Sequence, residues 1–99
     1  MTNLNASPKR WRAGFPLGRI VMTDGASQAL SPHDIATALL RHARGDWGEV
    51  CSPDWEVNGR ALEGGGRLLS AYHDRRGVRF WIVTEADRSA TTVLLPDDY

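Results

Sequence analysis

The chain has 99 residues, which gives room for one small domain with a single hydrophobic core. Its twelve basic residues are balanced by twelve acidic ones, which argues against a protein that coats DNA, because such proteins carry a clear basic excess. Eleven of the twelve basic residues are arginines, whose planar guanidinium group suits bidentate contacts with phosphates or carboxylates. Any contact with RNA or DNA must therefore be local.

The cysteine and histidine content predicts neither a disulfide nor a metal site. Cys51 is the only cysteine, and no lysine or arginine lies within four residues of it, so we expect a buried structural thiol. The three histidines, His33, His42 and His73, fall in three separate elements without metal-ligand spacing. No apolar segment has the length of a signal peptide or a membrane span. We expect a cytoplasmic protein that has no membrane contact and needs no metal or other cofactor.

Residues 1–14 lack periodicity and contain Asn, Ser, Pro and Gly, which predicts a flexible basic arm before a single domain over residues 15–99. Trp11 lies between Arg10 and Arg12, so the arm could stack on a base or dock on a partner. The alternative is a solvated arm without a binding role.

The first half of the domain predicts one strand and two helices. The apolar run at residues 17–23 ends at an Asp-Gly turn signal and predicts the strand. A Ser-Pro pair at positions 31 and 32 predicts the start of a helix over residues 32–44, and a second Ser-Pro pair begins a helix that runs to Glu63. Between the helices, Trp47 is expected to anchor a tight glycine-flanked loop. Helical spacing predicts a buried stripe of Ile35, Ala38, Leu39 and His42.

The last third of the chain predicts an antiparallel meander. Three apolar runs are separated there by the polar clusters DRRG and EADRS, which is the pattern of three strands joined by two turns. The order is therefore β-α-α-β-β-β. It predicts an α+β fold with two helices packed on one face of a four-stranded, mainly antiparallel sheet.

The parity of the strands predicts which side chains share a face. A turn at Arg75 and Arg76 would place Tyr72 opposite Arg79 and Ser70 opposite Trp81. The face expected under the helices then carries Leu69, Ala71, Val78, Phe80 and Ile82. The other face carries Leu68, Ser70, Tyr72, Arg79, Trp81 and Val83, and Thr91, Val93 and Leu95 if Thr84 pairs with Ala90. Because this second face is very apolar, we expect it to be covered by the arm or a loop, to self-associate, or to bind an outside protein or nucleic acid.

Two sets of candidate site residues follow. The candidate binding residues combine aromatic groups, arginines and the polar turn between the last two strands: Trp11, Arg67, Tyr72, Arg79, Trp81, Asp87 and Arg88. If the protein cleaves RNA, the catalytic candidates are Tyr72, Arg79, Glu85 and Arg88. A glutamate could take the 2′-hydroxyl proton while arginine neutralises the phosphate. The alternative is a structural turn in which Asp87 caps the backbone and Arg88 pairs with Glu85 or Asp87.

Several segments resemble a group of small bacterial "plasmid-related" proteins carried on plasmids, phages and integrated elements. The resemblance lies in residues 45–48, 65–72, 84–89 and 92–96 and in Tyr99, and it covers residues 15–99. It implies a mobile-element protein and brings no established activity. The element order also resembles that of RelE/ParE-type toxins, for which Arg67, Tyr72, Arg79, Arg88 and Tyr99 would be the positions to test, although the chain lacks their net positive charge.

We therefore expect a small accessory protein of a mobile genetic element, with a non-enzymatic role favoured. It would bind a protein or nucleoprotein complex and could inhibit a host defence or nucleic-acid-processing complex. The alternatives are a RelE-like ribonuclease toxin and a structural homodimer that buries the face of Trp81.

Overall fold

The fold is seen in a computed structural model, which describes residues 14–99; Trp11 and the rest of the predicted arm before Gly14 lie outside this range. The elements in chain order are β1 (Arg19–Met22), α2 (Asp24–Ala29), α3 (Pro32–Ala43), α4 (Ser52–Gly64), β2 (Leu68–His73), β3 (Arg79–Thr84), β4 (Ala90–Leu94) and the short 3-10 helix η1 (Pro96–Asp98). Among these described residues, no helix combines the length and the apolar character needed to cross a membrane.

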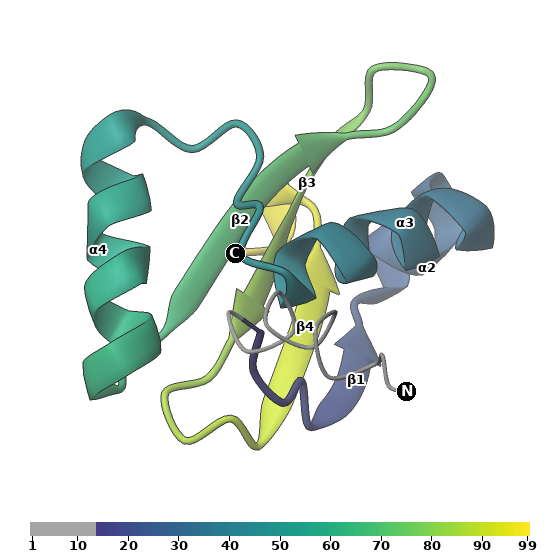
Figure 1. Ribbon diagram of the computed structural model, residues 1–99. Coiled ribbons are helices and arrows are strands. Elements are labelled where there is room, and N and C mark those ends of the chain that lie inside the picture. The colour runs from purple at the N-terminus through teal and green to yellow at the C-terminus, as the bar shows by residue number, and fades with distance from the viewer. Residues whose placement is uncertain (1–13) are drawn as a thin grey trace, which may run out of the picture.

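The four strands form one mixed sheet in the order β1-β4-β3-β2 (Figure 1). Strand β1 runs parallel to β4, whereas the β2–β3 and β3–β4 pairs are antiparallel. The predicted α+β fold and its element order are thus confirmed, with α2 as an additional helix. Since parallel neighbours need a long crossover, the helical segment between β1 and β2 accounts for the one parallel pair.

Helices α2 and α3 each begin after a short polar side chain that accepts a hydrogen bond from a backbone N–H of the first turn. The Ser31 hydroxyl accepts a hydrogen bond from the Asp34 N–H at 3.2 Å, and Pro32 occupies the first turn of α3. In α2 the Thr23 hydroxyl accepts from the Ala26 N–H at 3.1 Å. The sequence interpretation of an Asp-Gly turn at this point was wrong, because Thr23 caps a helix that starts at Asp24.

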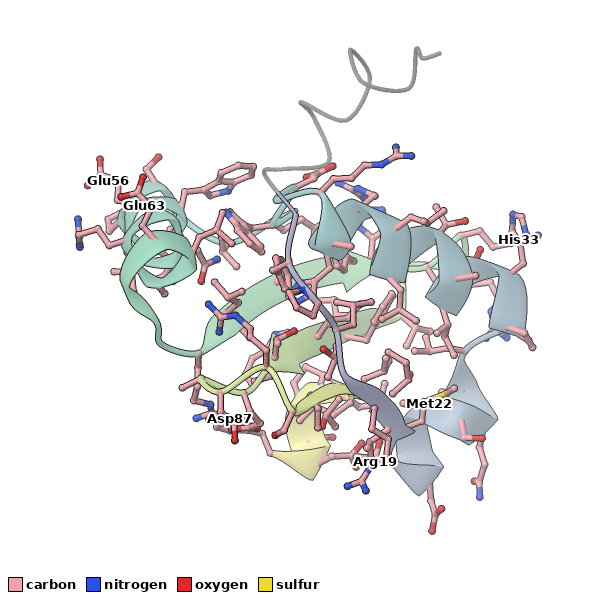
Figure 2. The ribbon with its side chains drawn as sticks, turned by 60° about the horizontal axis from the view of Figure 1, so that its bottom comes forward. Arg19, Met22, His33, Glu56, Glu63 and Asp87 are labelled. Carbon is pink, nitrogen blue, oxygen red and sulfur yellow. The ribbon has the colours of Figure 1, made fainter. Side chains whose placement is uncertain are left out.

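All three helices pack on the same face of the sheet (Figure 2). One core cluster joins Ala26 of α2 and the buried stripe of α3 to the strands, and a second joins Ala61 of α4 to Leu68 and Trp47. Trp47 is buried, as predicted, and packs edge-on against His42. The strand residues on this helix-covered face are Leu68, Ser70, Tyr72, Phe80, Ile82, Thr84, Thr91 and Val93.

The predicted register of the first hairpin was wrong by one residue. Tyr72 pairs with Phe80, and Ser70 pairs with Ile82. The cause is a loop one residue longer than assumed: Asp74 N–H bonds to the Val78 carbonyl at 2.9 Å, and Gly77 adopts a positive φ of 89° as the third loop residue. A one-residue shift reverses the face of every side chain on β2.

The second hairpin is shifted in the same way. Thr84 pairs with Thr91 instead of Ala90, and Arg88 takes a positive φ of 63° in the connecting turn. Thr91 and Val93 therefore lie under the helices, whereas the sequence interpretation put them on the opposite face with Trp81.

The outer edge of β2 is covered by other parts of the chain. The buried Asn58 side chain of α4 donates to the Leu69 carbonyl at 2.8 Å and accepts from the Leu69 N–H at 3.2 Å. Two residues on, the Ala71 N–H donates to the Trp47 carbonyl and the Ala71 carbonyl accepts from the Glu49 N–H. Helix α4, which Figure 1 shows beside β2, thus closes this edge together with the loop that precedes it.

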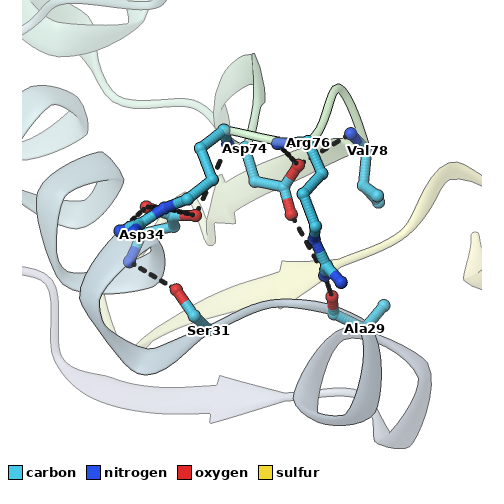
Figure 3. A network of polar contacts seen from close by, with 7 residues as sticks. Ala29, Ser31, Asp34, Asp74, Arg76 and Val78 are labelled. Atoms are coloured by element: carbon cyan, nitrogen blue, oxygen red, sulfur yellow. Dashed lines mark hydrogen bonds and ion pairs between the residues drawn. The ribbon is translucent and has the colours of Figure 1, made fainter.

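The β2–β3 loop is fastened to the helices by a network of charged side chains (Figure 3). The buried Asp74 carboxylate accepts from the Arg76 and Val78 N–H groups at 2.9 and 2.8 Å, and the Arg76 guanidinium reaches the Ala29 carbonyl. Burial opposes ionisation of Asp74, but these hydrogen bonds outweigh it and lower its pKa. The Arg75 guanidinium makes a bidentate pair with Asp34, which lowers the pKa of that carboxyl.

Candidate functional site

The face of the sheet opposite the helices carries an aromatic pair flanked by arginines. The rings of Trp81 and Tyr99 meet edge to face, with centroids 5.5 Å apart. The Arg67 guanidinium lies 5.9 Å from the centre of the Tyr99 ring and donates to the Tyr99 hydroxyl at 3.2 Å. Arg79 lies two residues before Trp81 on the same face. We call Arg67, Arg79, Trp81 and Tyr99 the open-face patch.

The open-face patch lies above a small apolar layer. Val83 and Leu94 belong to this face and are buried, although α2, α3 and α4 all pack on the opposite face. Trp81 is half-buried and Tyr99 is 70% exposed, so the end of the chain covers part of the face and leaves its own aromatic ring accessible. The sequence analysis offered cover by the arm or a loop as one alternative for this face. Partial cover is present, and residues near Tyr99 supply it.

This face carries exposed arginines as well as acidic side chains. Arg19 of β1 lies on the same side of the sheet as the patch, and Figure 2 shows it away from the helices, as it does Asp87. Arg67 approaches Glu85 at 3.7 Å, a long contact between exposed groups that contributes little. Within residues 14–99, Arg19 and Arg79 form no salt bridge. The face thus offers guanidinium groups that an acidic partner could pair with.

Tyr72, a predicted binding and catalytic residue, is not part of this face. The corrected register turns its side chain under the helices, where it is only 2% exposed. Its hydroxyl donates to the Asp46 carbonyl at 2.6 Å, and the Arg41 guanidinium lies 4.7 Å from its ring. Burial raises the pKa of the Tyr72 phenol, which keeps it protonated. Tyr72 therefore holds the loop between α3 and α4 instead of meeting a ligand.

Arg88 and Asp87, also predicted as binding residues, serve the turn in which they lie. The Arg88 guanidinium donates to the carbonyls of Ala61 at 2.9 Å and Gly66 at 2.6 Å, and further bonds join it to its own turn. A cation at the last turn of α4 also complements the helix dipole. The Asp87 carboxylate accepts from the Ser89 N–H at 3.0 Å. The Asp87 contact agrees with the sequence alternative, in which this carboxylate caps the backbone of the turn, whereas Arg88 binds backbone carbonyls instead of the expected Glu85 or Asp87.

The four predicted ribonuclease residues do not converge. Tyr72 and Arg79 lie on opposite faces of the sheet. Arg79 begins β3 and Glu85 follows its end, so about 20 Å of extended chain separates them. Arg88 is engaged with backbone carbonyls. The structure therefore brings Arg67 near Glu85, but it does not gather the four predicted residues around one substrate position.

A chain of buried hydrogen bonds links α3 to the sheet, and sequence reasoning did not find it. The His42 ring contacts the Ser70 hydroxyl through Nδ1 and the Thr84 hydroxyl through Nε2, the latter at 2.8 Å. Thr84 contacts Thr91, which donates to the Leu17 carbonyl at 2.7 Å. Ser70 and His42 are fully buried, so this serine–histidine contact cannot meet a substrate. The one signal in the sequence was the place of His42 in the predicted buried stripe of the helix over residues 32–44.

Two other polar features of the surface lie outside the open-face patch. A shallow hollow beside α3 contains Arg41 and Arg75, but Asp46 and Asp34 pair with them, which leaves no free charge for a ligand. Cys51 is exposed, contrary to the expected buried thiol, and its Sγ contacts Asp54 at 3.3 Å. Within the described part of the chain, no three histidine, cysteine or acidic side chains are grouped to hold a metal ion.

Comparisons with protein-family models, with curated proteins and with solved structures find no match to the chain.

Proposed function

We propose that this protein is a cytoplasmic accessory protein of a mobile genetic element that acts by binding a macromolecular partner on the open-face patch. One observation carries the binding proposal: the half-buried Trp81 and the exposed Tyr99 form an aromatic pair between arginines on the sheet face that α2, α3 and α4 leave uncovered. The mobile-element part is supported by the sequence resemblance to plasmid-related proteins.

The composition of the patch favours a partner with an acidic surface. Tryptophan, tyrosine and arginine are the residue types that contribute most at binding interfaces, because they combine large contact area with hydrogen-bonding groups. Arg79 supplies a guanidinium that no acidic group within residues 14–99 neutralises. A protein or nucleoprotein complex with carboxylates or phosphates at its surface would fit this arrangement. Such binding could inhibit a host defence or nucleic-acid-processing complex by occupying its surface.

Charge reversal within the patch tests this proposal. Tagged wild-type protein and the Arg79→Glu variant would be used to capture partners from a bacterial lysate, half of it treated with nuclease, followed by quantitative mass spectrometry. Arg60→Glu is the matched control, because Arg60 is an exposed arginine of α4 on the other side of the molecule. We expect Arg79→Glu to reduce the captured partner about tenfold or more and Arg60→Glu to leave it unchanged.

The outcomes separate the possible modes of binding. Capture that survives nuclease and is lost in Arg79→Glu supports direct protein binding by the patch. Capture that nuclease abolishes identifies a nucleoprotein bound through its RNA or DNA. Equal loss in Arg79→Glu and Arg60→Glu, or loss in neither, would contradict a binding role for the patch.

A further inference from the structure

The two edges of the sheet differ in how their backbone groups are satisfied. Asn58 and the loop before α4 cover the β2 edge, as described above. The other edge is β1, a four-residue strand of sequence RIVM in which Arg19 is the only charged residue and which contains no proline or bulge. Ile20 and Met22 on this edge are 41% and 44% exposed, and Figure 2 shows Met22 at the margin of the sheet.

The hydrogen bonds of β1 show which of its backbone groups point outward. The Arg19 N–H donates to the Ser89 carbonyl at 3.0 Å, and the Thr23 N–H donates to the Val93 carbonyl at 3.1 Å. Since backbone groups alternate in direction along a strand, Ile20 and Met22 direct their N–H and C=O groups away from β4. Within residues 14–99 these outward groups have no hydrogen-bond partner.

We propose that a second copy of this chain pairs with β1 in the antiparallel direction and forms a continuous eight-stranded sheet. In the register with the most hydrogen bonds, Ile20 of each chain lies opposite Met22 of the other, and Val21 lies on the two-fold axis. Both outward residues of each strand then exchange N–H···O bonds with the second copy, about four bonds in all. This surface is separate from the open-face patch and does not depend on the proposed function.

The side chains and charges of β1 favour a second copy of the chain as the partner and favour antiparallel pairing. Ile20 and Met22 point to the helix-covered side, so the pairing would bury an isoleucine against a methionine twice. Arg19 begins the strand and the exposed Asp24 follows its end. Antiparallel pairing brings the Arg19 end of one copy to the Asp24 end of the other, whereas parallel pairing would align two arginines. A symmetric edge with these features is complementary to itself.

Sedimentation equilibrium of charge variants tests the surface and the register together. We expect wild-type protein to dimerise. The double variant Ile20→Lys, Met22→Lys should raise the dissociation constant of the dimer at least tenfold, because the proposed register places its lysines opposite each other. Ile20→Lys with Met22→Glu should restore dimers, since the proposed register places each introduced lysine opposite a glutamate. Leu40→Lys, at an exposed apolar position on α3, is the control and should dimerise as wild type does. Circular dichroism of each variant would show that the fold is retained.

A crosslinking experiment tests the position of the two-fold axis. Directly opposed residues in a non-hydrogen-bonded antiparallel pair have Cα atoms about 4.5 Å apart, within disulfide range. Val21→Cys in a Cys51→Ser background should therefore form covalent dimers on mild oxidation, whereas Thr37→Cys in the same background should not. The proposal would be overturned if the wild-type protein stayed monomeric at all concentrations. It would also be overturned if the dimer persisted in the double-lysine variant and was lost in Trp81→Glu, because that result would assign dimerisation to the open face.

Discussion

At the residue scale, the buried hydrogen-bond chain fixes the protonation of His42. The Thr91 hydroxyl uses its only proton on the Leu17 carbonyl, so Thr84 must donate to Thr91. The His42 Nε2 atom must then donate to Thr84, which leaves Nδ1 to accept the Ser70 proton. A second proton on the ring would force the Ser70 hydroxyl to turn and to find another acceptor for its own proton. The network therefore favours a neutral imidazole.

His42 should make the protein sensitive to mild acid. Burial, with a smaller effect from the charge of Arg88, lowers the pKa of His42 from its ordinary value of 6.5 to about 4. Between those values the unfolded chain binds a proton that the folded chain does not, so stability is full above pH 6.5 and falls as the pH drops toward 4. The loss should reach about 3 kcal/mol. Urea unfolding from pH 7 to pH 4 measures it.

The comparison variant for that experiment is His42→Gln, whose side chain does not titrate. This variant should be less stable than wild type at pH 7, because the buried hydrogen-bond network loses the imidazole ring. Its free energy of unfolding should, however, change less with pH over the same range. His33→Gln, at an exposed position of α3, should keep the wild-type pH profile. A profile for His42→Gln as steep as that of wild type would show that another group causes the acid sensitivity.

Arg88 should be a stability residue. Replacing it with alanine removes charged hydrogen bonds to the ends of α4 and of the following loop, and the φ of 63° stays unfavourable for a side chain. We expect Arg88→Ala to lower the free energy of unfolding by about 2–4 kcal/mol. Arg88→Gly loses the same bonds but relieves the backbone, and should be about 1 kcal/mol more stable than Arg88→Ala. Chemical denaturation ranks the two, and the opposite order would argue against backbone strain at this position.

At the element scale, α3 and α4 could be predicted from the sequence because their signals are local, whereas the short α2 was missed. The Ser-Pro starts of α3 and α4 and the buried stripe of α3 all depend on neighbouring residues. The hairpin registers were missed because each depends on a single residue in the left-handed conformation, Gly77 in one loop and Arg88 in the other. An arginine gives no signal for that conformation, and one extra loop residue moved Tyr72 from the expected binding face into the core.

The attachment of α4 to the sheet edge should depend on Asn58. Asn58→Leu retains an apolar volume but leaves the N–H and C=O of Leu69 without partners, which should cost about 2–4 kcal/mol in the free energy of unfolding. The neighbouring Gly59→Ala is the control: its added methyl group meets no atom within 4 Å, and a helix-interior alanine should stabilise by about 1 kcal/mol. Hydrogen exchange at Leu69 should accelerate in Asn58→Leu alone. Unchanged exchange there would contradict the edge-capping role.

At the scale of the whole molecule, the two proposed surfaces would combine in a defined way. The two-fold axis of an antiparallel β1 pair is perpendicular to the sheet, so both helical layers would lie on one side of the dimer. The two open-face patches would then face the other side together. A partner with repeated acidic sites could meet both patches at once, and the second contact would form at high effective concentration.

This arrangement predicts that dimerisation matters for multivalent partners only. The monomeric variant Ile20→Lys with Met22→Lys should bind a soluble, monovalent partner as wild type does, because the open-face patch is unchanged. On a surface coated densely with that partner, the same variant should dissociate about tenfold faster or more than wild type, because it lacks the second contact. The Ile20→Lys, Met22→Glu variant should regain the slow dissociation, and Arg79→Glu should bind weakly in both formats while remaining dimeric. Surface plasmon resonance at two partner densities measures all four proteins. Equal dissociation rates for wild type and the monomeric variant at high density would mean that the two patches do not act together.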